Sequence, residues 1–370
     1  MRVTVVLGTR PEVIKLAPVV ANLRGRGAEV RVVHTGQHTD SALATGLESE
    51  CRLSVDARWQ LPDDSAARLG HVFEYALKEF ASFATDAAIV LGDTWTVPLI
   101  GMAARSYGVP VVHVEAGLRS HNLRSQEEVN RRAAVACARL HLAPTTHAAR
   151  ALRGEGVAAG EIVITGNPVT DALRATGLAI AAPGQRRGVL FTAHRASNVD
   201  DPDRLSELAT IVEHLTRHFD HVTFPMHPRT RARAEAFGLT DRFARHCDVV
   251  EPLGYRALLD VLRMSTIVVT DSGGLQEEAA WFKVPAVVMR ATTPRPEGID
   301  AQLATLCGVD HKRVMTAATQ LTTAASVEHI MATPCPYGDG HAAPRIASAI
   351  ASAFVAGRLQ LREPELHAAA

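Results

Sequence analysis

The 370-residue sequence has few features that would bind a polyanion or cross a membrane. Lysine plus arginine and aspartate plus glutamate both number 39, so the formal net charge is zero. A general nucleic-acid or anionic-membrane binder needs a basic excess to neutralise phosphates, and we therefore expect neither partner. Aromatic residues make up only 5% of the chain, too few to indicate base-stacking platforms. No apolar run approaches the length of a membrane span.

The motifs of common metal and cofactor sites are also absent. The five cysteines are far apart and form no C-x-x-C pair, which predicts reduced thiols. The N-terminus lacks the layout of a signal peptide, and we expect a cytoplasmic protein. The sequence has no H-E-x-x-H, P-loop, G-x-G-x-x-G or G-x-S-x-G motif. We therefore expect no metal and no cofactor, and in particular no nicotinamide.

The sequence does contain short apolar, β-branched runs that alternate with longer amphipathic stretches. The runs in the first half are Val3–Leu7, Val30–His34, Ala88–Leu91, Val109–Val114 and Glu161–Thr165. Those in the second half are Gly188–Thr192, His221–Pro225, Asp248–Val250, Thr266–Thr270 and Ala286–Met289. Continuous apolar strands separated by helices indicate parallel sheets that are covered on both faces. The predicted fold class is α/β, with two facing Rossmann-like doubly wound domains around a central cleft.

The predicted domain boundary lies in Thr176–Arg187, a polar, turn-rich segment without periodicity. It gives an N-terminal domain at 1–175 and a C-terminal domain at 176–370. We expect the second domain to end in a helix within Ala342–Leu361 and an alanine-rich tail. Two such sheets place the carboxyl ends of their strands around one ligand site.

Basic residues and one carboxylate follow two strands of the first domain. The segment Gly8–Lys15 has a glycine turn and a proline at a helix start, so that Arg10 and Lys15 can face a phosphate. The alternative is a strand-to-helix turn with surface basic residues. Asp93 follows another strand and is expected to point into the crevice, although a helix N-cap is the alternative role.

Two further acidic positions follow the strand that ends at Val114. Glu115 must be paired or functional because burying a lone carboxylate is expensive, and Arg119 is a candidate partner. Glu127 belongs to the acidic segment Gln126–Arg131, for which a solvated helix start is the alternative interpretation.

In the second domain, His194 and His227 each lie at the mouth of a strand. Thr270–Ala279 contains a strand end, two glycines and a helix start. The free N–H groups of such a helix would form a diphosphate seat at Gly273 and Gly274.

Three more residues near this seat are candidates for ligand binding. Ser272 can add a hydroxyl to the diphosphate seat, and Glu278 lies one turn into the helix, where it could hold ribose. Arg295 follows the next strand and supplies another cation. We favour the functional interpretation of this segment over a purely structural one.

Taken together, these segments resemble the non-hydrolysing UDP-N-acetylglucosamine 2-epimerases. The matching segments run in order from residue 8 to residue 340: Gly8–Lys15, Thr35–His38, Gly92–Thr94, His113–Ser120, Glu127–Arg131, Thr165–Asn167, His194–Arg195, Pro225–Thr230, Thr270–Ala279, Arg295–Glu297 and Pro336–Gly340. The resemblance implies a GT-B-like fold, UDP binding mainly in the second domain, and a homodimer whose small-molecule partner is a UDP-sugar.

The resemblance also implies a reaction in which UDP leaves the sugar to give 2-acetamidoglucal and then returns. Proton transfer at C2 is assigned to Asp93, Glu115 and Glu127, and His194 completes the catalytic set. Substrate binding is assigned to Arg10, Lys15, Ser272, Gly273, Gly274, Glu278 and Arg295. An effector site beside the active site would use Gln37, His38, Arg195 and His227.

The sequence departs from the family pattern at several places. Val135 and Arg139 stand where the family commonly has aspartates on the helix after Asn130. Ser197 and Pro294 stand in place of glutamates, and Gln302 stands in place of a glycine. These changes predict weak or absent activation by an effector. Three alternatives stay open: a hydrolysing 2-epimerase that releases N-acetylmannosamine and UDP, a GT-B glycosyltransferase, and a nucleotide-sugar sensor without turnover.

Overall fold

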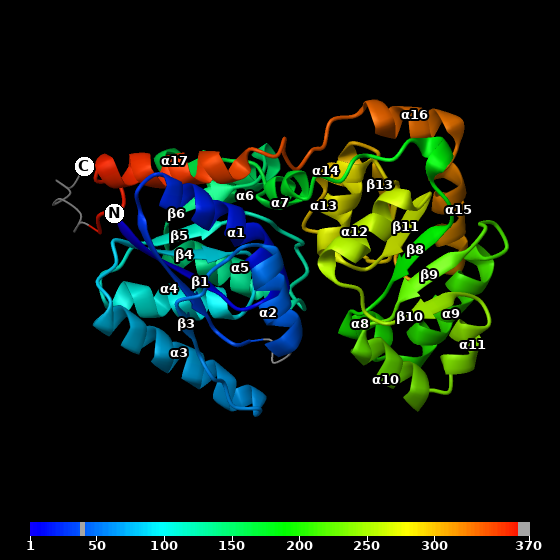
Figure 1. Cartoon of the computed structure of the whole chain (residues 1–370), viewed down its shortest axis with the longest axis horizontal. Coiled ribbons are helices and arrows are strands. Elements are labelled where there is room, and N and C mark those ends of the chain that lie inside the picture. Colours follow the sequence, from blue (N-terminus) through cyan, green and yellow to red (C-terminus); the bar gives the residue numbers. More distant parts are fainter. Residues whose placement is uncertain (38–40, 362–370) are drawn as a thin grey trace. The chain divides into compact units, whose positions relative to one another are not determined.

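Two parallel β-sheets organise the chain in the computed structural model, which describes residues 1–37 and 41–361. The chain divides into two compact units. Unit 1 comprises Met1–Ala172 together with the chain from Gly338 onward, and unit 2 comprises Leu173–Tyr337. Figure 1 shows helices on both faces of the sheet in each unit. The α/β fold class predicted from alternating apolar and amphipathic segments is confirmed.

Unit 1 contains, within the described residues, a sheet of seven parallel strands in the order β3-β2-β1-β4-β5-β6-β7. The strands are β1 Arg2–Leu7, β2 Glu29–His34, β3 Ala57–Arg58, β4 Ala87–Leu91, β5 Val111–Val114, β6 Ala138–Ala143 and β7 Ile162–Ile164. The helices are α1 Arg10–Gly25, α2 Ser41–Glu50, α3 Ser65–Ser82, α4 Thr96–Ser106, α5 Gln126–Cys137, α6 Thr146–Gly154, α7 Val169–Ala175 and α17 Ala342–Val355, with a 3-10 turn η1 at Ala159–Glu161. Helix α7 spans the boundary between the units.

Unit 2 contains, among its described residues, a sheet of six parallel strands in the order β10-β9-β8-β11-β12-β13. The strands are β8 Val189–Thr192, β9 Val222–Pro225, β10 Asp248–Val250, β11 Ile267–Thr270, β12 Ala286–Val288 and β13 Ala304–Leu306. The helices are α8 Ala196–Val199, α9 Pro202–Leu215, α10 Pro228–Ala236, α11 Thr240–Ala244, α12 Tyr255–Met264, α13 Gly273–Phe282, α14 Glu297–Asp300, α15 His311–Leu321 and α16 Ala324–Ala332, with a 3-10 turn η2 at Pro183–Gln185.

The order of the strands creates one switch point in each sheet, where successive connections leave in opposite directions. In unit 1 this point lies between β1 and β4, and in unit 2 it lies between β8 and β11. Ligands of open α/β sheets bind outside the carboxyl ends of the strands at such points. A ligand-binding site is therefore expected in the loops that follow these four strands.

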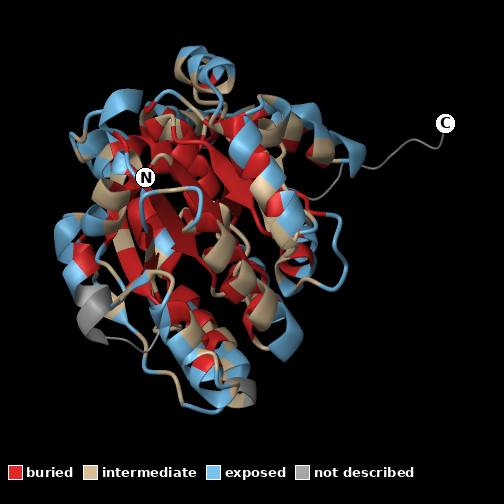
Figure 2. Cartoon of the chain, turned by 90° about the vertical axis from the view of Figure 1, so that its right-hand side faces the viewer, coloured by how far each residue is buried: buried red, intermediate tan, exposed pale blue. Residues whose placement is uncertain are grey.

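The strands form where the sequence is apolar and β-branched because both faces of each sheet are covered. Buried residues concentrate on the strands and on the inward sides of the helices (Figure 2). In unit 2, the Phe191 and Phe224 rings on neighbouring strands meet edge to face with centroids 4.9 Å apart. All ten predicted runs contain a strand. Strand β6 was missed because Arg139 and His141 interrupt its apolar pattern, and Arg139 lies on this strand and not on helix α5.

The C-terminal helix corrects the predicted domain division. We assigned residues 176–370 to the second domain, but the chain from Gly338 onward belongs to unit 1. The Asp171 carboxylate accepts the backbone N–H groups of Ala342 at 2.8 Å and Ala343 at 3.0 Å, and so caps the first turn of α17. The buried side of α17 packs against α1 (Figure 1). This packing depends on contacts between the two ends of the chain, which the local sequence pattern does not reveal.

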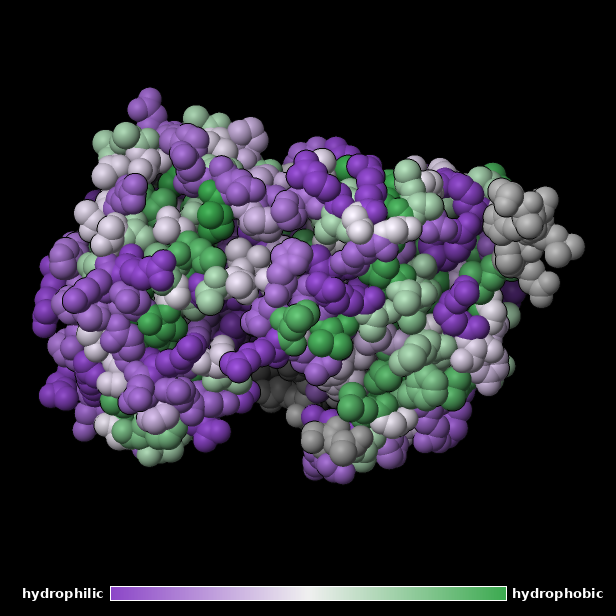
Figure 3. All heavy atoms as spheres, turned by 180° about the vertical axis from the view of Figure 1, so that it is seen from behind, coloured by the Kyte–Doolittle hydropathy of each residue, from purple (hydrophilic) through white to green (hydrophobic). Residues whose placement is uncertain are grey.

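The described surface has hydrophilic residues interspersed with small apolar groups on the face seen in Figure 3. Among the exposed large apolar side chains, Leu69 on α3, Met102 on α4 and the nearby Tyr107 belong to unit 1. No helix within the described ranges is long and apolar enough to span a membrane.

Candidate active site

The loop after β1 is built around Glu12, a residue that the sequence analysis did not single out. Glu12 is buried, and its Oε2 accepts the backbone N–H groups of Gly8 at 2.7 Å and Thr9 at 2.9 Å. Its Oε1 accepts the Thr94 hydroxyl at 2.8 Å. Glu12 therefore ties the loop after β1 to the loop after β4, the two loops at the switch point of unit 1. Burial outweighs these hydrogen bonds and raises the pKa of Glu12 to about 7.

Glu115 follows β5 in a left-handed backbone conformation, with a φ of 62°. Its side chain is 3% exposed, and Lys15 Nζ lies 2.8 Å from Oε1 and 2.9 Å from Oε2. Asn167 Nδ2 donates to Oε1 at 3.2 Å. A non-glycine residue in this conformation is strained, and such strain is concentrated at functional sites. Arg119 is not the partner of Glu115, because its guanidinium binds Glu155 with two nitrogen–oxygen distances of 2.6 Å.

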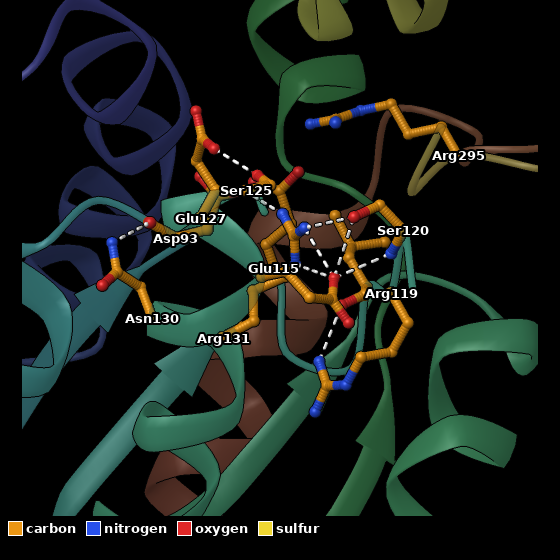
Figure 4. Close-up of polar contacts among 12 residues, drawn as sticks. Asp93, Glu115, Arg119, Ser120, Ser125, Glu127, Asn130, Arg131 and Arg295 are labelled. Atoms are coloured by element: carbon orange, nitrogen blue, oxygen red, sulfur yellow. Dashed lines mark hydrogen bonds and ion pairs between the residues drawn. The ribbon is translucent and has the colours of Figure 1, made fainter. Parts of the chain in front are cut away.

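Asp93 follows Gly92 at the end of β4 and forms an ion pair with Arg131 (Figure 4). The side chain of Asn130 donates to the backbone carbonyl of Asp93 at 3.0 Å. The Asp93 side chain is 31% exposed and is thus accessible to a ligand. Helix α4 begins only at Thr96, with Trp95 as its N-cap residue, so Asp93 is not the helix cap that we considered as an alternative.

The acidic segment before Arg131 divides into one buried and one partly exposed carboxylate. Glu128 is fully buried and accepts Ser120 N–H and Arg131 Nη2, each at 2.8 Å. Burial alone would raise its pKa, but these hydrogen bonds and the Arg131 charge outweigh it and lower the pKa to about 2. Glu127 is partly exposed in the first turn of α5 and accepts the Ser125 hydroxyl. Figure 4 shows Glu127, Asp93 and Glu115 in the same part of unit 1.

A buried histidine supports the turn that precedes Asp93. His113 Nε2 lies 2.8 Å from the carbonyl oxygen of Gly92, which can only accept, so Nε2 carries the proton. Burial lowers the pKa of His113 to about 4. His141, its register partner on β6, also has a pKa lowered by burial to about 4. Both rings are therefore neutral near pH 7, and His113 acts there as a hydrogen-bond donor.

The switch point of unit 2 brings together the loops after β8 and β11. His194 and Arg195 follow β8, and their backbone N–H groups donate to the Asp271 carboxylate that follows β11. The His194 and His227 rings lie with centroids 5.7 Å apart, so the structure brings the two predicted strand-mouth histidines together. His227 is the N-cap residue of α10 and accepts the Arg229 N–H at 3.1 Å.

Helix α13 begins at the predicted double glycine. Ser272 is its N-cap residue, and its hydroxyl oxygen accepts the Leu275 N–H at 3.5 Å. A Cβ atom on Gly273 would lie 2.9 Å from Arg295 Nη1, so glycine allows the guanidinium to approach the helix start. Arg295 is oriented by Glu277, whose Oε1 accepts its Nε–H at 2.6 Å. Free helical N–H groups beside an arginine form a suitable seat for an anion.

The predicted residues that remain are divided between the two units. Glu278 is buried within α13, and Arg10 is the first residue of α1. Gln37 belongs to unit 1, whereas Arg195 belongs to unit 2. His38, the fourth residue of the predicted effector set, lies outside the described residues.

Two doubly wound sheets with polar residues at both switch points define a GT-B-like α/β protein. The family model described as UDP-N-acetylglucosamine 2-epimerase matches residues 21–351. The UDP-N-acetylglucosamine 2-epimerase of Methanococcus maripaludis is 32% identical over 335 residues, which cover 85% of this chain and 90% of that protein. The enzyme of that name from Bacillus subtilis is 34% identical and covers 94% of both chains. The chain belongs to the UDP-N-acetylglucosamine 2-epimerase family, whose members are isomerases.

A solved structure with the same architecture is that of the Methanocaldococcus jannaschii UDP-GlcNAc 2-epimerase in complex with UDP-GlcNAc and UDP. It superposes with a TM-score of 0.87 at 29% sequence identity and covers 95% of this chain and all of its own. The GT-B-like fold that the resemblance implied is thereby confirmed.

Proposed function

We propose that this protein interconverts UDP-N-acetylglucosamine and UDP-N-acetylmannosamine and keeps the UDP during the reaction. Membership of the family supports the class of substrate. The observation that carries the proposal is Glu115, a buried carboxylate in a left-handed conformation at the carboxyl end of a strand. Its ion pair with Lys15 compensates the cost of burial, and Asp93 supplies a second, partly exposed carboxylate in the same unit.

The chemistry of the sugar requires more than one proton-transfer group. C2 bears an acetamido nitrogen and has no adjacent carbonyl, so its C–H bond is not acidic in the ground state. When the C1–O bond to the diphosphate breaks, positive charge develops at C1 and makes the C2 proton acidic. A carboxylate takes that proton, and 2-acetamidoglucal and UDP remain bound. UDP then returns to C1 while a second group protonates C2 on the opposite face.

We assign proton transfer to Asp93, Glu115 and Glu127. A positioned acid or base contributes about 10²–10⁴-fold. In unit 2, the α13 N-terminus, His194 and Arg295 would hold the diphosphate and stabilise the charge that develops as it leaves. Ser272, Gly273 and Gly274 supply this helix start, and Glu278 would hold the ribose. In unit 1, Arg10 would contact the diphosphate and Lys15 would support Glu115.

A time course by NMR in D₂O tests this function. Purified protein is mixed with UDP-N-acetylglucosamine, and the C2 proton, UDP and free sugars are followed. We expect UDP-N-acetylmannosamine to form, and deuterium to enter C2 of both product and recovered substrate. Accumulation of free N-acetylmannosamine and UDP would identify a hydrolysing enzyme instead. Retention of the original C2 proton during turnover would disprove the elimination.

A further inference from the structure

Glu128, in the first turn of α5, is a buried carboxylate to which the assigned mechanism gives no role. Its side chain is fully buried, and its Oε2 accepts the Ser120 N–H at 2.8 Å and the Ser120 hydroxyl at 3.0 Å. The same oxygen accepts Arg131 Nη2 at 2.8 Å and Arg131 Nε at 3.3 Å. Glu128 therefore holds the Arg131 guanidinium against the segment that follows Glu115.

A second nitrogen of the Arg131 guanidinium contacts Asp93. Nη1 of Arg131 forms an ion pair with Asp93 Oδ2 (Figure 4), and Nη2 also donates to the Ser120 hydroxyl at 3.2 Å. The Arg131 side chain is only 4% exposed. A guanidinium is planar and presents its donors in a fixed geometry, so bonds on two of its nitrogens restrict the direction of the third. The direction in which Arg131 meets Asp93 thus depends on the contact with Glu128.

Asp93 is held in two separate ways by successive residues of α5. Asn130 Nδ2 donates to the Asp93 backbone carbonyl at 3.0 Å, and Asn130 Oδ1 accepts Gln126 Nε2 at 3.1 Å. This contact fixes the backbone of Asp93 and leaves its side chain to other partners. Within the described residues, Arg131 is the one hydrogen-bond donor to the Asp93 carboxylate. The orientation of that carboxylate is therefore set by Arg131.

The charges of Glu128 and Arg131 keep the two side chains together. Burial alone would raise the pKa of Glu128, but hydrogen bonds from Ser120 and Arg131 and the Arg131 charge outweigh it and lower the pKa to about 2. The arginine stays protonated. Separating the pair would leave two buried charges without counterions, which is costly. Arg131 is thus a rigid support for Asp93.

We propose that Glu128 is a positioning residue that fixes the Arg131 guanidinium and, through it, the direction of the Asp93 carboxylate. This inference rests on the proposed function, in which Asp93 transfers a proton at C2. Glu128 and Arg131 take no part in the proton transfer itself. An acid or base must lie within hydrogen-bond reach of the proton it moves, and a misplacement of about 1 Å can cost about 10²-fold. The effect of Glu128 should therefore appear in kcat and not in nucleotide binding.

A double-mutant cycle in the full-length protein tests whether Glu128 acts through Asp93. Glu128→Gln keeps the size of the side chain and removes the charge that holds Arg131. We expect it to lower kcat at least about tenfold, with the Kd for UDP changed little. In the Asp93→Asn background, the same substitution should lower kcat by less than about twofold, because the group that it positions is already absent. Losses in kcat that multiply, or normal turnover in Glu128→Gln, would overturn the proposal.

Two further variants separate positioning from a general disturbance of the fold. Arg132→Gln is the matched control, because Arg132 Nε lies 3.4 Å from Oε1 of the same Glu128 and its side chain is 47% exposed. This variant should keep kcat much closer to that of the unmodified protein than Glu128→Gln does. Arg131→Lys keeps the charge but lacks the planar fork that reaches both carboxylates, and it should lower kcat as Glu128→Gln does. If Glu128→Gln does not fold, the cycle of Arg131→Lys with Asp93→Asn decides the question by the same criterion.

Unfolding in urea gives a readout that does not require turnover. When Glu128→Gln or Asp93→Asn is made alone, Arg131 keeps one carboxylate partner, but in the double variant its buried charge loses both. We therefore expect the double variant to lower the unfolding midpoint by more than the sum of the two single losses. Additive losses would show that Arg131 does not link the two carboxylates, and the inference would be wrong.

The kinetic and unfolding cycles also separate this inference from the function on which it rests. If the unmodified protein does not convert UDP-N-acetylglucosamine, the proposed function fails, while the unfolding cycle still decides whether Glu128 and Asp93 are linked. If conversion occurs and the two losses in kcat multiply, only the inference fails.

Discussion

Lys15 and Glu115 lie 100 positions apart in the sequence, yet Lys15 Nζ approaches both oxygens of the Glu115 carboxylate within 2.9 Å. Both side chains are at most 5% exposed. Removing one member of a buried pair leaves an uncompensated charge, which costs about 3–5 kcal/mol. The Lys15–Glu115 pair therefore affects the free energy of unfolding, besides any role in the reaction.

We predict that Lys15→Met lowers the free energy of unfolding by about 3–5 kcal/mol in urea titrations. The double variant Lys15→Met, Glu115→Gln should recover part of that loss, because no buried charge remains. The control is Lys78→Met, which breaks the exposed ion pair with Glu74 and should change the free energy of unfolding far less than Lys15→Met does. A loss below about 1 kcal/mol in Lys15→Met would contradict the importance of the pair.

Removing the charge of each proposed acid or base should affect turnover rather than nucleotide binding. Asp93→Asn, Glu115→Gln and Glu127→Gln should each lower kcat by at least about 10²-fold, with the Kd for UDP changed little. Steady-state kinetics and calorimetry measure the two quantities. Glu74→Gln, an exposed site, serves as the control. Near-normal turnover in Asp93→Asn would mean that Asp93 serves only to hold Arg131.

The buried histidines should make the protein less stable in mild acid. The pKa of His141 is lowered to about 4 in the folded chain, so the unfolded chain binds more protons between about pH 4 and 6.5. The contribution of neutral His141 to the free energy of unfolding is thus fully present above about pH 6.5 and is lost as the pH drops toward 4.

Glu12 acts in the opposite direction. Its pKa is raised to about 7, so its contribution to the free energy of unfolding falls as the pH rises from about 4.5 to 7.

The histidine contribution can be isolated with His141→Asn. The free energy of unfolding of the unmodified protein should decrease between pH 6.5 and pH 4.5. In His141→Asn we expect this decrease to be about 2 kcal/mol smaller. The matched control is His218→Asn, which makes the same substitution at an exposed position. Identical pH dependence in the His141 variant and the unmodified protein would show that burial does not shift this group.

Much of the fold and part of the site could be predicted from the sequence. Apolar runs are local, and parallel strands bring the residues that follow them to one edge of the sheet, which is why the positions of Asp93 and Glu115 at strand ends were predictable. Glu12 and Asp271 were missed because their roles arise from partners in other segments. The same holds for Arg119, whose partner Glu155 lies 36 positions away.

Gln302 stands where the family pattern has a glycine, and the structure gives a physical reason for that pattern. Its φ is 58°, in the left-handed region that glycine adopts without strain. We predict that Gln302→Gly leaves the thermal midpoint unchanged or raises it, because relief of strain offsets the entropy that glycine adds to the unfolded chain. Gln302→Val should lower it clearly, since a β-branched residue tolerates this conformation poorly. Equal thermal midpoints for Gln302→Gly and Gln302→Val would show that the backbone of Gln302 is not strained.

The residues of the expected effector site are partly engaged within the fold. Two of them already have structural partners, because Arg195 Nε binds the backbone of Asp271 and His227 caps α10. Ser197, which replaces a glutamate of the family pattern, is exposed and brings no charge to an effector. An effector controls activity only through its different affinity for two states, typically about 1–3 kcal/mol. Loss of a charge-assisted contact, worth about 1.5–3 kcal/mol, removes a coupling of that size.

We therefore expect turnover to start from pure UDP-N-acetylmannosamine without added UDP-N-acetylglucosamine, and initial rates to give a Hill coefficient near one. Ser197→Glu restores the acidic residue and is the informative comparison, because a gain of activation by UDP-N-acetylglucosamine in this variant alone would place the lost coupling at that position. A reverse reaction of the unmodified protein that stays silent until UDP-N-acetylglucosamine is added would contradict the prediction. It would mean that the retained residues carry the coupling without the glutamate.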